Sequence, residues 1–399
     1  MLFSLALIFL CGILLGGIFQ KLKLPSLLGM LITGIILGPY ALNLLDPSIL
    51  SISADLRQIA LIIILTRAGL NLDIKELKKV GRPAVLMCFI PATLEIVGML
   101  IFAPMLLGIS LLEAAILGTV IAAVSPAVIV PKMLKLMDEG YGTDKSIPQL
   151  IMAGASVDDV FVIVLFTSFC GLATSGTFSA ASLLRIPVSI VLGIGAGILS
   201  GILLSYLFKK IHIRDTGKVI IFISVSFLLV TLEHLLSSII GFSGLLAVMA
   251  MGVAIKNQLG SVSSRLSAKF SKLWVCAEIV LFVLVGATVD ISFALSSGIN
   301  TVLLIFLVLI FRMFGVLICM IKTNLSRGER IFSMIAYTPK ATVQAAIGSI
   351  PLTMGLSCGN IVLTVAVVAI LITAPLGALA IDLTYKKLLK KGNKKSAVK

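Results

Sequence analysis

The sequence predicts an all-α membrane protein of about thirteen transmembrane helices. Of its 399 residues, 59% are hydrophobic and only 12% are charged, and the mean hydropathy is +1.19. A soluble domain usually carries roughly 25% charged residues, so a soluble fold would leave much of this apolar surface in water. Apolar runs of about 20 residues, long enough to cross a hydrocarbon core of about 30 Å, follow one another along almost the whole chain.

The apolar runs are interrupted by charges, glycine or proline, and each run predicts one helix. In chain order the predicted spans are 2–20, 25–42, 55–73, 82–107, 111–137, 147–171, 183–208, 217–239, 243–258, 270–290, 299–321, 329–354 and 360–385. Nothing remains for a soluble domain, so residues 1–385 are predicted to form a single transmembrane unit. The basic cytoplasmic tail that follows, residues 386–399, is too short to fold alone.

Most of the 32 lysines and arginines lie in every second predicted loop. Short cytoplasmic loops accumulate these residues, so the pattern predicts an N-terminus outside and a C-terminus inside, in a multi-pass protein of the cell (inner) membrane. The same loops account for the net charge of +15, so the expected partner is the lipid bilayer and not nucleic acid. The six cysteines show no CxxC spacing, which argues against a disulfide framework or a zinc site, and no cofactor is expected.

Three charged residues are predicted to lie deep in the membrane. Asp158 and Asp159 are adjacent in the predicted helix 147–171, and Lys340 lies in the predicted helix 329–354. At about 1.5 Å per residue, Asp158 is about 18 Å and Lys340 about 16 Å from the cytoplasmic end of its helix. An ionised side chain at that depth costs at least about 2.5–3.5 kcal/mol, which makes all three candidates for function.

This group suits an exchange of ions. Carboxylate oxygens bind either protons or a small hard cation such as Na⁺ or Li⁺, and competition for one carboxylate couples the release of one to the binding of the other. The alternative is a structural Asp–Lys pair that only joins two helices. That alternative leaves the second aspartate without a role at an unfavourable depth.

Glu95 and Arg312 form a second charged pair in the prediction. Each lies about 20 Å from one end of its predicted helix, Glu95 from the inner end and Arg312 from the outer end. Arginine stays charged in nearly any environment, so Arg312 needs a carboxylate at this depth, and Glu95 can supply it. We expect a structural ion pair that holds the core together.

Two predicted helices contain a hydroxyl residue followed by proline halfway along an apolar run. These are Ser125 and Pro126 in AAVSPAVIVPK, and Thr338 and Pro339 in AYTPKATVQAAIGSIP. Proline removes a backbone donor and disfavours helical angles at the residue before it, so Ser125 and Thr338 are expected to be unwound. The two runs are the fifth and twelfth, an odd offset that reverses direction across the membrane. The pattern therefore predicts inverted repeats with two crossing discontinuous helices beside Asp158 and Asp159.

Four motifs in these segments, LTRAGLNLD, AVSPAVIVPKML, GASVDDV and PKATVQAAIG, resemble the cation/proton antiporter superfamily. The sequence is most similar to the NHA-type sodium/hydrogen exchangers and their bacterial relatives. The resemblance implies that Asp159 binds the cation, with the Ser125 hydroxyl near it. It also implies that Asp158 is paired with Lys340, and that Glu95 and Arg312 form an ion pair in the core.

The same resemblance implies an NhaA-like fold, a homodimer and an elevator-like transport cycle. A core of about 82–171 and 299–385 would move against a dimerisation domain of about 1–73 and 217–290, with a linker helix at about 183–208.

Two other functions compete with antiport. A sodium-coupled symporter of similar fold is disfavoured by the paired aspartates with a lysine. An intramembrane aspartyl protease needs two aspartates on separate helices, whereas Asp158 and Asp159 are adjacent and no GxGD motif is present. The sequence therefore predicts a transporter and not an enzyme, exchanging Na⁺ or Li⁺ for H⁺, and leaves the preference among Na⁺, Li⁺ and K⁺ open.

Overall fold

The computed structural model describes residues 1–72, 81–175, 180–236, 241–290 and 298–392. Within these ranges the protein is helical, and the only β-pairing is an isolated bridge between Tyr141 and Lys391. Eight helices in the described part of the chain are long and apolar enough to cross a membrane, and shorter apolar helices accompany them. The all-α membrane class predicted from the sequence is therefore correct.

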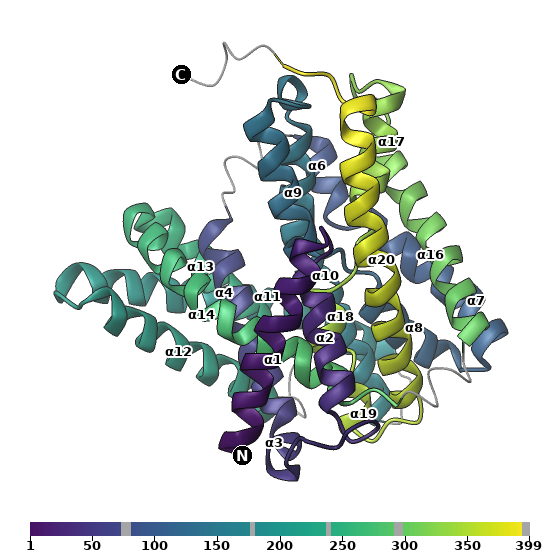
Figure 1. Cartoon of the computed structure of the whole chain (residues 1–399). Helices are drawn as coiled ribbons and strands as arrows, with labels where there is room; N and C mark the ends of the chain where they lie inside the picture. The colour runs from purple at the N-terminus through teal and green to yellow at the C-terminus, as the bar shows by residue number, and fades with distance from the viewer. Residues whose placement is uncertain (73–80, 176–179, 237–240, 291–297, 393–399) are drawn as a thin grey trace. The chain divides into compact units, whose positions relative to one another are not determined.

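The chain divides into two compact units (Figure 1). Unit 1 comprises Met1–Ser51, Lys75–Ile163 and Phe282–Lys399, and unit 2 comprises Ile52–Ile74 and Val164–Leu281. Residues 1–51, which the sequence analysis assigned to a dimerisation domain, group with unit 1 by their contacts.

Both predicted helix breaks, near Ser125 and Thr338, lie in unit 1. The helices of unit 1 are α1 (Leu2–Lys21), α2 (Ser26–Leu37), α3 (Pro47–Ser51), α6 (Arg82–Met87), α7 (Ile90–Leu107), α8 (Leu111–Ile121), α9 (Pro126–Glu139), the first part of α10 (Ile147–Ser175), the last residues of α14 (Gly260–Ala287), α16 (Gly298–Cys319), α17 (Arg327–Ala336), α18 (Thr342–Ile347), α19 (Ile350–Thr353) and α20 (Gly359–Leu388). The predicted helix 111–137 is thus interrupted at 122–125, and the predicted helix 329–354 at 337–341.

Two further interruptions were not predicted, and one of them, at residues 348 and 349 in the expected helix 329–354, separates α18 from α19. In the other, the expected helix 82–107 divides into α6 and α7 at Cys88 and Phe89, because Pro91 lies in the first turn of α7 and cannot continue the ladder of hydrogen bonds from α6. Phe89, at φ −133° and ψ −46°, lies outside the helical region of backbone angles.

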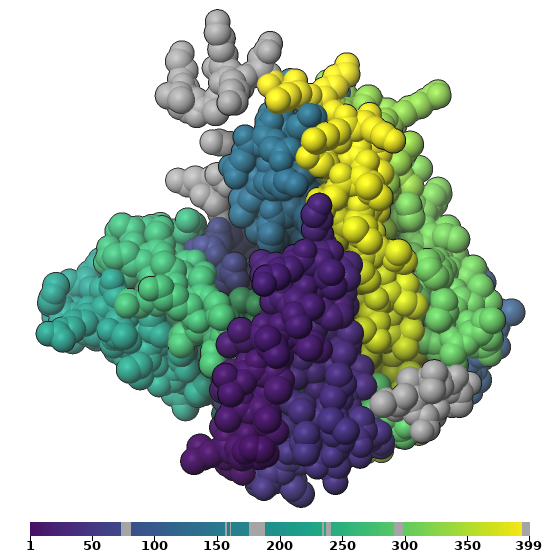
Figure 2. All heavy atoms as spheres, in the orientation of Figure 1, coloured from purple at the N-terminus to yellow at the C-terminus, as the bar shows by residue number. Residues whose placement is uncertain are grey.

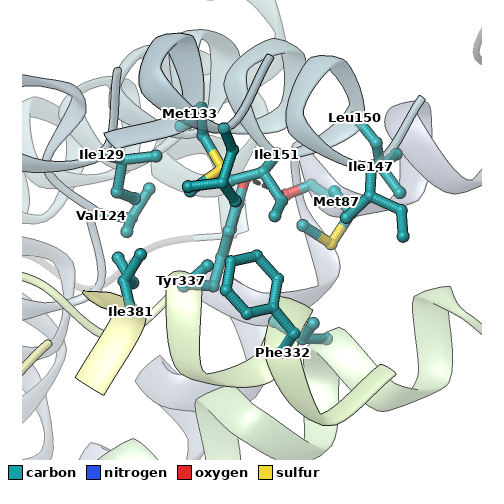
Figure 3. Close-up of a cluster of buried hydrophobic side chains, with 14 of the residues drawn as sticks. Met87, Val124, Ile129, Met133, Ile147, Leu150, Ile151, Phe332, Tyr337 and Ile381 are labelled. Carbon is teal, nitrogen blue, oxygen red and sulfur yellow. Dashed lines mark hydrogen bonds between the residues drawn. The ribbon is translucent and has the colours of Figure 1, made fainter. Parts of the chain in front are cut away.

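The long helix α20 packs against many of the other helices of unit 1. It runs between α9 and α17 and also contacts α8, α16, α18 and α19 (Figure 1). A cluster of buried apolar side chains fills the space among α6, α9, α10, α17 and α20 around Tyr337 (Figure 3). The Tyr337 hydroxyl donates to Met87 O at 3.3 Å, and Gly154 leaves room for that hydroxyl, since a Cβ there would lie 2.4 Å from it.

The segment after α20 is paired with a loop. Gly142 N donates to Lys390 O at 2.9 Å, and Gly392 N donates to Gly140 O at 2.7 Å. Gly140 and Gly142 have φ of +81° and +69°, angles that favour glycine. Residues 386–388 continue α20, so the predicted boundary of the tail at Tyr385 was too early. Figure 2 shows this end of α20, in yellow, against the blue surface of α9.

Unit 2 consists of long helices packed through small residues. It contains α4 (Ser53–Asn71), the second part of α10, α11 (Ala180–Lys210), α12 (Asp215–Leu236), α13 (Gly244–Gln258) and most of α14. On α11, Gly193, Gly197 and Gly201 recur every four residues and face α13; a Cβ on Gly197 would lie 2.3 Å from Ala247 O. Such spacing of small residues lets membrane helices approach closely.

Candidate ion-binding site

The two breaks in unit 1 touch each other. Ser125, the N-cap of α9, has an extended backbone (φ −92°, ψ 108°), and its N–H donates to Pro339 O at 2.8 Å. The hydroxyl oxygens of Ser125 and Thr342 lie 3.5 Å apart. The unwound segments around Pro126 and Pro339 therefore cross, with two neutral hydroxyls at the crossing.

The last carbonyls of an α-helix have no N–H partner within the helix, so those at the end of α8 need donors from elsewhere. Here the carbonyls of residues 120–123 are all within hydrogen-bonding distance of donor nitrogens from two side chains. The Gln344 amide nitrogen lies 3.1, 3.2 and 2.9 Å from the carbonyl oxygens of Val120, Ile121 and Ala123, and Arg312 Nη1 donates to that of Ala122. Arg312 Nε also donates to Tyr337 O at 2.7 Å, so Arg312 joins both breaks.

Four buried charges form one cluster beside the breaks. Arg312 donates from Nη1 to Glu95 Oε2 at 2.8 Å and from Nη2 to Asp158 Oδ2 at 2.7 Å. Lys340 Nζ donates to the same Glu95 oxygen at 2.6 Å. The side chains of all four are between 0 and 1% exposed. The expected contact between Glu95 and Arg312 is present.

The expected pairing of Asp158 with Lys340 differs in the structure. Lys340 bonds Glu95, and Asp158 is held by Arg312 and by Val124 N, which donates to Asp158 Oδ2 at 2.9 Å. The physical reason is the planar guanidinium of Arg312, whose several donors reach two carboxylates at once and leave Glu95 to be shared. The two groups predicted as separate pairs are therefore one cluster.

Asp159 stands apart from this cluster. Its side chain is largely buried, with the residue 8% exposed, and it forms no ion pair with any described residue. Its Oδ1 has no hydrogen-bond partner among the described residues. Adjacent helical positions point roughly 100° apart, which explains why the partners of Asp158 do not serve Asp159.

The charges of these five residues leave one negative charge uncompensated. Glu95 and Asp158 balance Arg312 and Lys340, and Asp159 adds one more carboxylate when all are ionised. One monovalent cation or one proton at Asp159 makes the group neutral.

Two polar groups at the site were not predicted from the sequence. Gln344 lies in the quoted motif PKATVQAAIG but received no role, and Thr373, on α20, accepts a hydrogen bond at 2.9 Å from Lys340 N. Both are buried polar residues in apolar runs. For Gln344, the signal was an amide just after a proline break, where unpaired carbonyls are expected.

Two broken helices that cross inside a helical membrane core, next to buried charges, are typical of ion transporters. Residues 5–387 match the sequence model of the family described as sodium/hydrogen exchanger, transmembrane. The chain is 35% identical over 412 residues to human sodium/hydrogen exchanger 9B2, covering 98% of this chain and 75% of that protein. Human sodium/hydrogen exchanger 9B1 is 31% identical over 422 residues, with 100% and 80% covered.

The fold agrees with a solved structure of the sodium proton antiporter MjNhaP1 from Methanocaldococcus jannaschii at pH 8, with a TM-score of 0.85. That match has 22% sequence identity and covers 96% of this chain and 97% of the other. The chain belongs to the sodium/hydrogen exchanger family. It is a multi-pass membrane transporter of the Na⁺/H⁺ antiport class and not an enzyme, which confirms the family and the activity expected from the sequence.

Proposed function

We propose that the chain exchanges Na⁺ or Li⁺ for H⁺ by alternating access, with the cation and the proton competing for Asp159. The observation that carries this proposal is the position of Asp159, a largely buried carboxylate with no basic partner among the described residues, beside a charge-balanced cluster. The Oδ1 atoms of both Asp158 and Asp159 lack hydrogen-bond partners in the described part of the chain, so they are available to a cation.

The neighbouring residues have supporting roles in this proposal. The hydroxyl oxygen of Ser125 is a neutral ligand at the crossing. Asp158 stays bonded to Arg312 and Val124 N, and its negative charge attracts the cation. Lys340 and Glu95 neutralise each other beside them. A cation that replaces the proton on Asp159 therefore meets oxygen ligands and no uncompensated positive charge.

An inverted repeat is supported by two matching capping boxes. Ser110 and Glu113 begin α8, and Ser326 and Glu329 begin α17, the first halves of the two broken helices. Each glutamate also reaches the segment that precedes the last helix of the other repeat. Glu113 Oε1 accepts from the Ser357 hydroxyl at 2.5 Å, before α20, and Glu329 Oε2 accepts from Lys145 Nζ at 2.8 Å, before α10.

We place about thirteen transmembrane segments in this topology, one for each apolar run. The N-terminus is outside and the C-terminus inside, because the lysines and arginines occupy alternate loops. The proposal includes a homodimer in the cell (inner) membrane. In each protomer, a core of about 82–171 and 299–385 moves against a dimerisation domain of about 1–73 and 217–290, joined by the linker helix at about 183–208.

Reconstituted proteoliposomes with a pH-sensitive dye inside test the proposal. Addition of NaCl to liposomes with an acidic lumen should raise the luminal pH, and the apparent KM for Na⁺ should rise as the pH falls, with the maximal rate unchanged at saturating Na⁺. A KM that does not change with pH would contradict a shared carboxylate. Sodium entry that requires an organic acid, without a change in luminal pH, would indicate the symporter instead. LiCl and KCl series in the same assay define the cation preference.

A further inference from the structure

Gln344 links the two broken helices through its amide. Gln344 lies in α18, which is part of the second broken helix. The carbonyls that it contacts lie at the end of α8 and in the 122–125 break of the first broken helix. The residue is 1% exposed, and its Oε1 has no hydrogen-bond partner among the described residues. It is thus a fully buried polar side chain whose donors serve only the backbone of the other helix.

The carbonyls that Gln344 contacts are of the kind that bind ions in other transporters. Unwound carbonyls and the C-terminal ends of half-helices coordinate Na⁺ in broken-helix folds. In this structure the carbonyls of residues 120–123 face Gln344 and Arg312. Their direction is fixed by N–H donors, and so is the path of the backbone that leads to Val124 and Ser125.

That backbone carries two groups of the ion site. Val124 N donates to Asp158 Oδ2 at 2.9 Å, and the next residue, Ser125, places its hydroxyl at the crossing. Both groups follow directly after Ala123, whose carbonyl has the shortest contact to Gln344, 2.9 Å. A site keeps its affinity only when a supporting shell holds its ligands in place.

We propose that Gln344 is a positioning residue for cation binding. Its amide holds the carbonyls of residues 120, 121 and 123 away from the ion and thereby sets the positions of Val124 N and the Ser125 hydroxyl beside the aspartates. Gln344 acts through the backbone and does not bind the cation. This inference rests on the proposed role of Asp159 as the ion site.

Gln344→Met tests the inference, because methionine keeps a similar volume and removes both amide donors. We expect the apparent KM for Na⁺ in proteoliposomes to rise about tenfold, with the maximal rate within about twofold of wild type. A tenfold change in KM corresponds to about 1.4 kcal/mol. The ratio of the KM values for Li⁺ and Na⁺ should also change, because released carbonyls offer each ion a different set of oxygens.

Thr119→Val is the matched control. Thr119 is buried in α8, the half-helix whose last carbonyls Gln344 contacts, and among the described residues its hydroxyl bonds only Ala115 O and Ile116 O. This variant should lower the melting temperature in detergent without changing either KM. A Gln344→Met variant that shows only a lower melting temperature, with both KM values at wild-type level, would overturn the inference and assign Gln344 a purely structural role.

If Gln344→Met cannot be purified in a folded state, Gln344→Asn tests the same inference. The shorter amide reaches fewer carbonyls, so the KM for Na⁺ should still rise, and an unchanged KM overturns the inference. Asp159→Asn is measured in parallel to separate the two hypotheses. An inactive Asp159→Asn with a wild-type KM in the Gln344 variants refutes only the role of Gln344, whereas an active Asp159→Asn refutes the proposed ion site itself.

Discussion

Charged side chains in the two units of the molecule find partners at different distances along the chain. In unit 1, the ion pairs join residues far apart in sequence: Arg312 and Asp158 are separated by 154 residues, Arg312 and Glu95 by 217, and Lys340 and Glu95 by 245. In unit 2, Glu233 accepts from Gly244 N at the start of α13, only 11 residues away, and Arg57 Nε donates to Ser53 O, four residues away.

The difference shows what each unit depends on. The charges of unit 1 are stable only when four separate segments, α7, α10, α16 and the 337–341 break, are assembled around one another. Glu233 and Arg57 of unit 2 bond to backbone groups close to them in sequence, and the helices of unit 2 are joined by glycine contacts such as those of α11 with α13. We therefore expect substitutions of the buried charged residues of unit 1 to change ion exchange, and substitutions in unit 2 to change stability alone.

Asp159→Asn should produce the largest effect, a fall of Na⁺/H⁺ exchange to the background of empty liposomes. The amide keeps the shape of the side chain but cannot exchange a proton for a cation. Dye-monitored exchange and the melting temperature in detergent are both measured, because the variant should stay folded. Exchange at the wild-type rate would show that Asp159 does not carry the ion.

Arg312→Met should be the most destabilising change in unit 1. It leaves the carboxylates of Asp158 and Glu95 without their guanidinium, and breaking a buried pair in this way costs about 3–5 kcal/mol. For an isolated pair, the joint replacement Glu95→Leu with Arg312→Met would restore stability. Here it should not, since Asp158 and Lys340 both lose a partner. Recovery of the melting temperature in the double variant would show that the cluster behaves as a simple pair.

Gly197→Val should lower stability without changing the KM for Na⁺. The new Cβ would lie 2.3 Å from Ala247 O, and overpacking of this kind typically costs about 1–3 kcal/mol. Gly195→Val is the matched control on the same helix, because a Cβ on Gly195 meets nothing within 4 Å. Equal melting temperatures for the two variants would argue against close packing of α11 on α13.

Glu233→Gln should have the smallest effect. The amide oxygen can still accept from Gly244 N, so only the interaction of a charge with a helix N-terminus is lost, typically about 0.3–1 kcal/mol. Exchange should be unchanged in proteoliposomes. A large loss of exchange would place an ion-carrying carboxylate in unit 2 and remove the contrast between the units.

The parts of this protein that were predictable from sequence are those set by neighbouring residues. The apolar runs give the helices, and a proline after Ser125 or Thr338 gives the breaks, because both effects act within one or two turns. Depth along a helix also identified Asp158, Asp159, Lys340, Glu95 and Arg312 as buried charges. Depth does not tell which helices are neighbours, so Lys340 was assigned to Asp158 when it bonds Glu95.

Gln344 was missed for the same reason. Its partners lie at the end of α8 and in the break after it, more than 200 residues earlier in the chain, and no local pattern points to them. The break at Cys88 and Phe89 was missed although Pro91 is a local signal, because the apolar run 82–107 is long enough to be read as one span.

The four-charge cluster has a consequence for how the chain is made. Ribosomes add about 5–20 residues per second, so roughly 8–30 s pass between the synthesis of Asp158 and that of Arg312, 154 residues later. During that interval the aspartate has no guanidinium to pair with, and an unpaired ion in the membrane is costly. Helix α10 must therefore wait in the bilayer with its carboxylates protonated or in contact with water. A chain that stalls before Arg312 presents the quality-control machinery of the cell with a membrane segment carrying two unmatched acids.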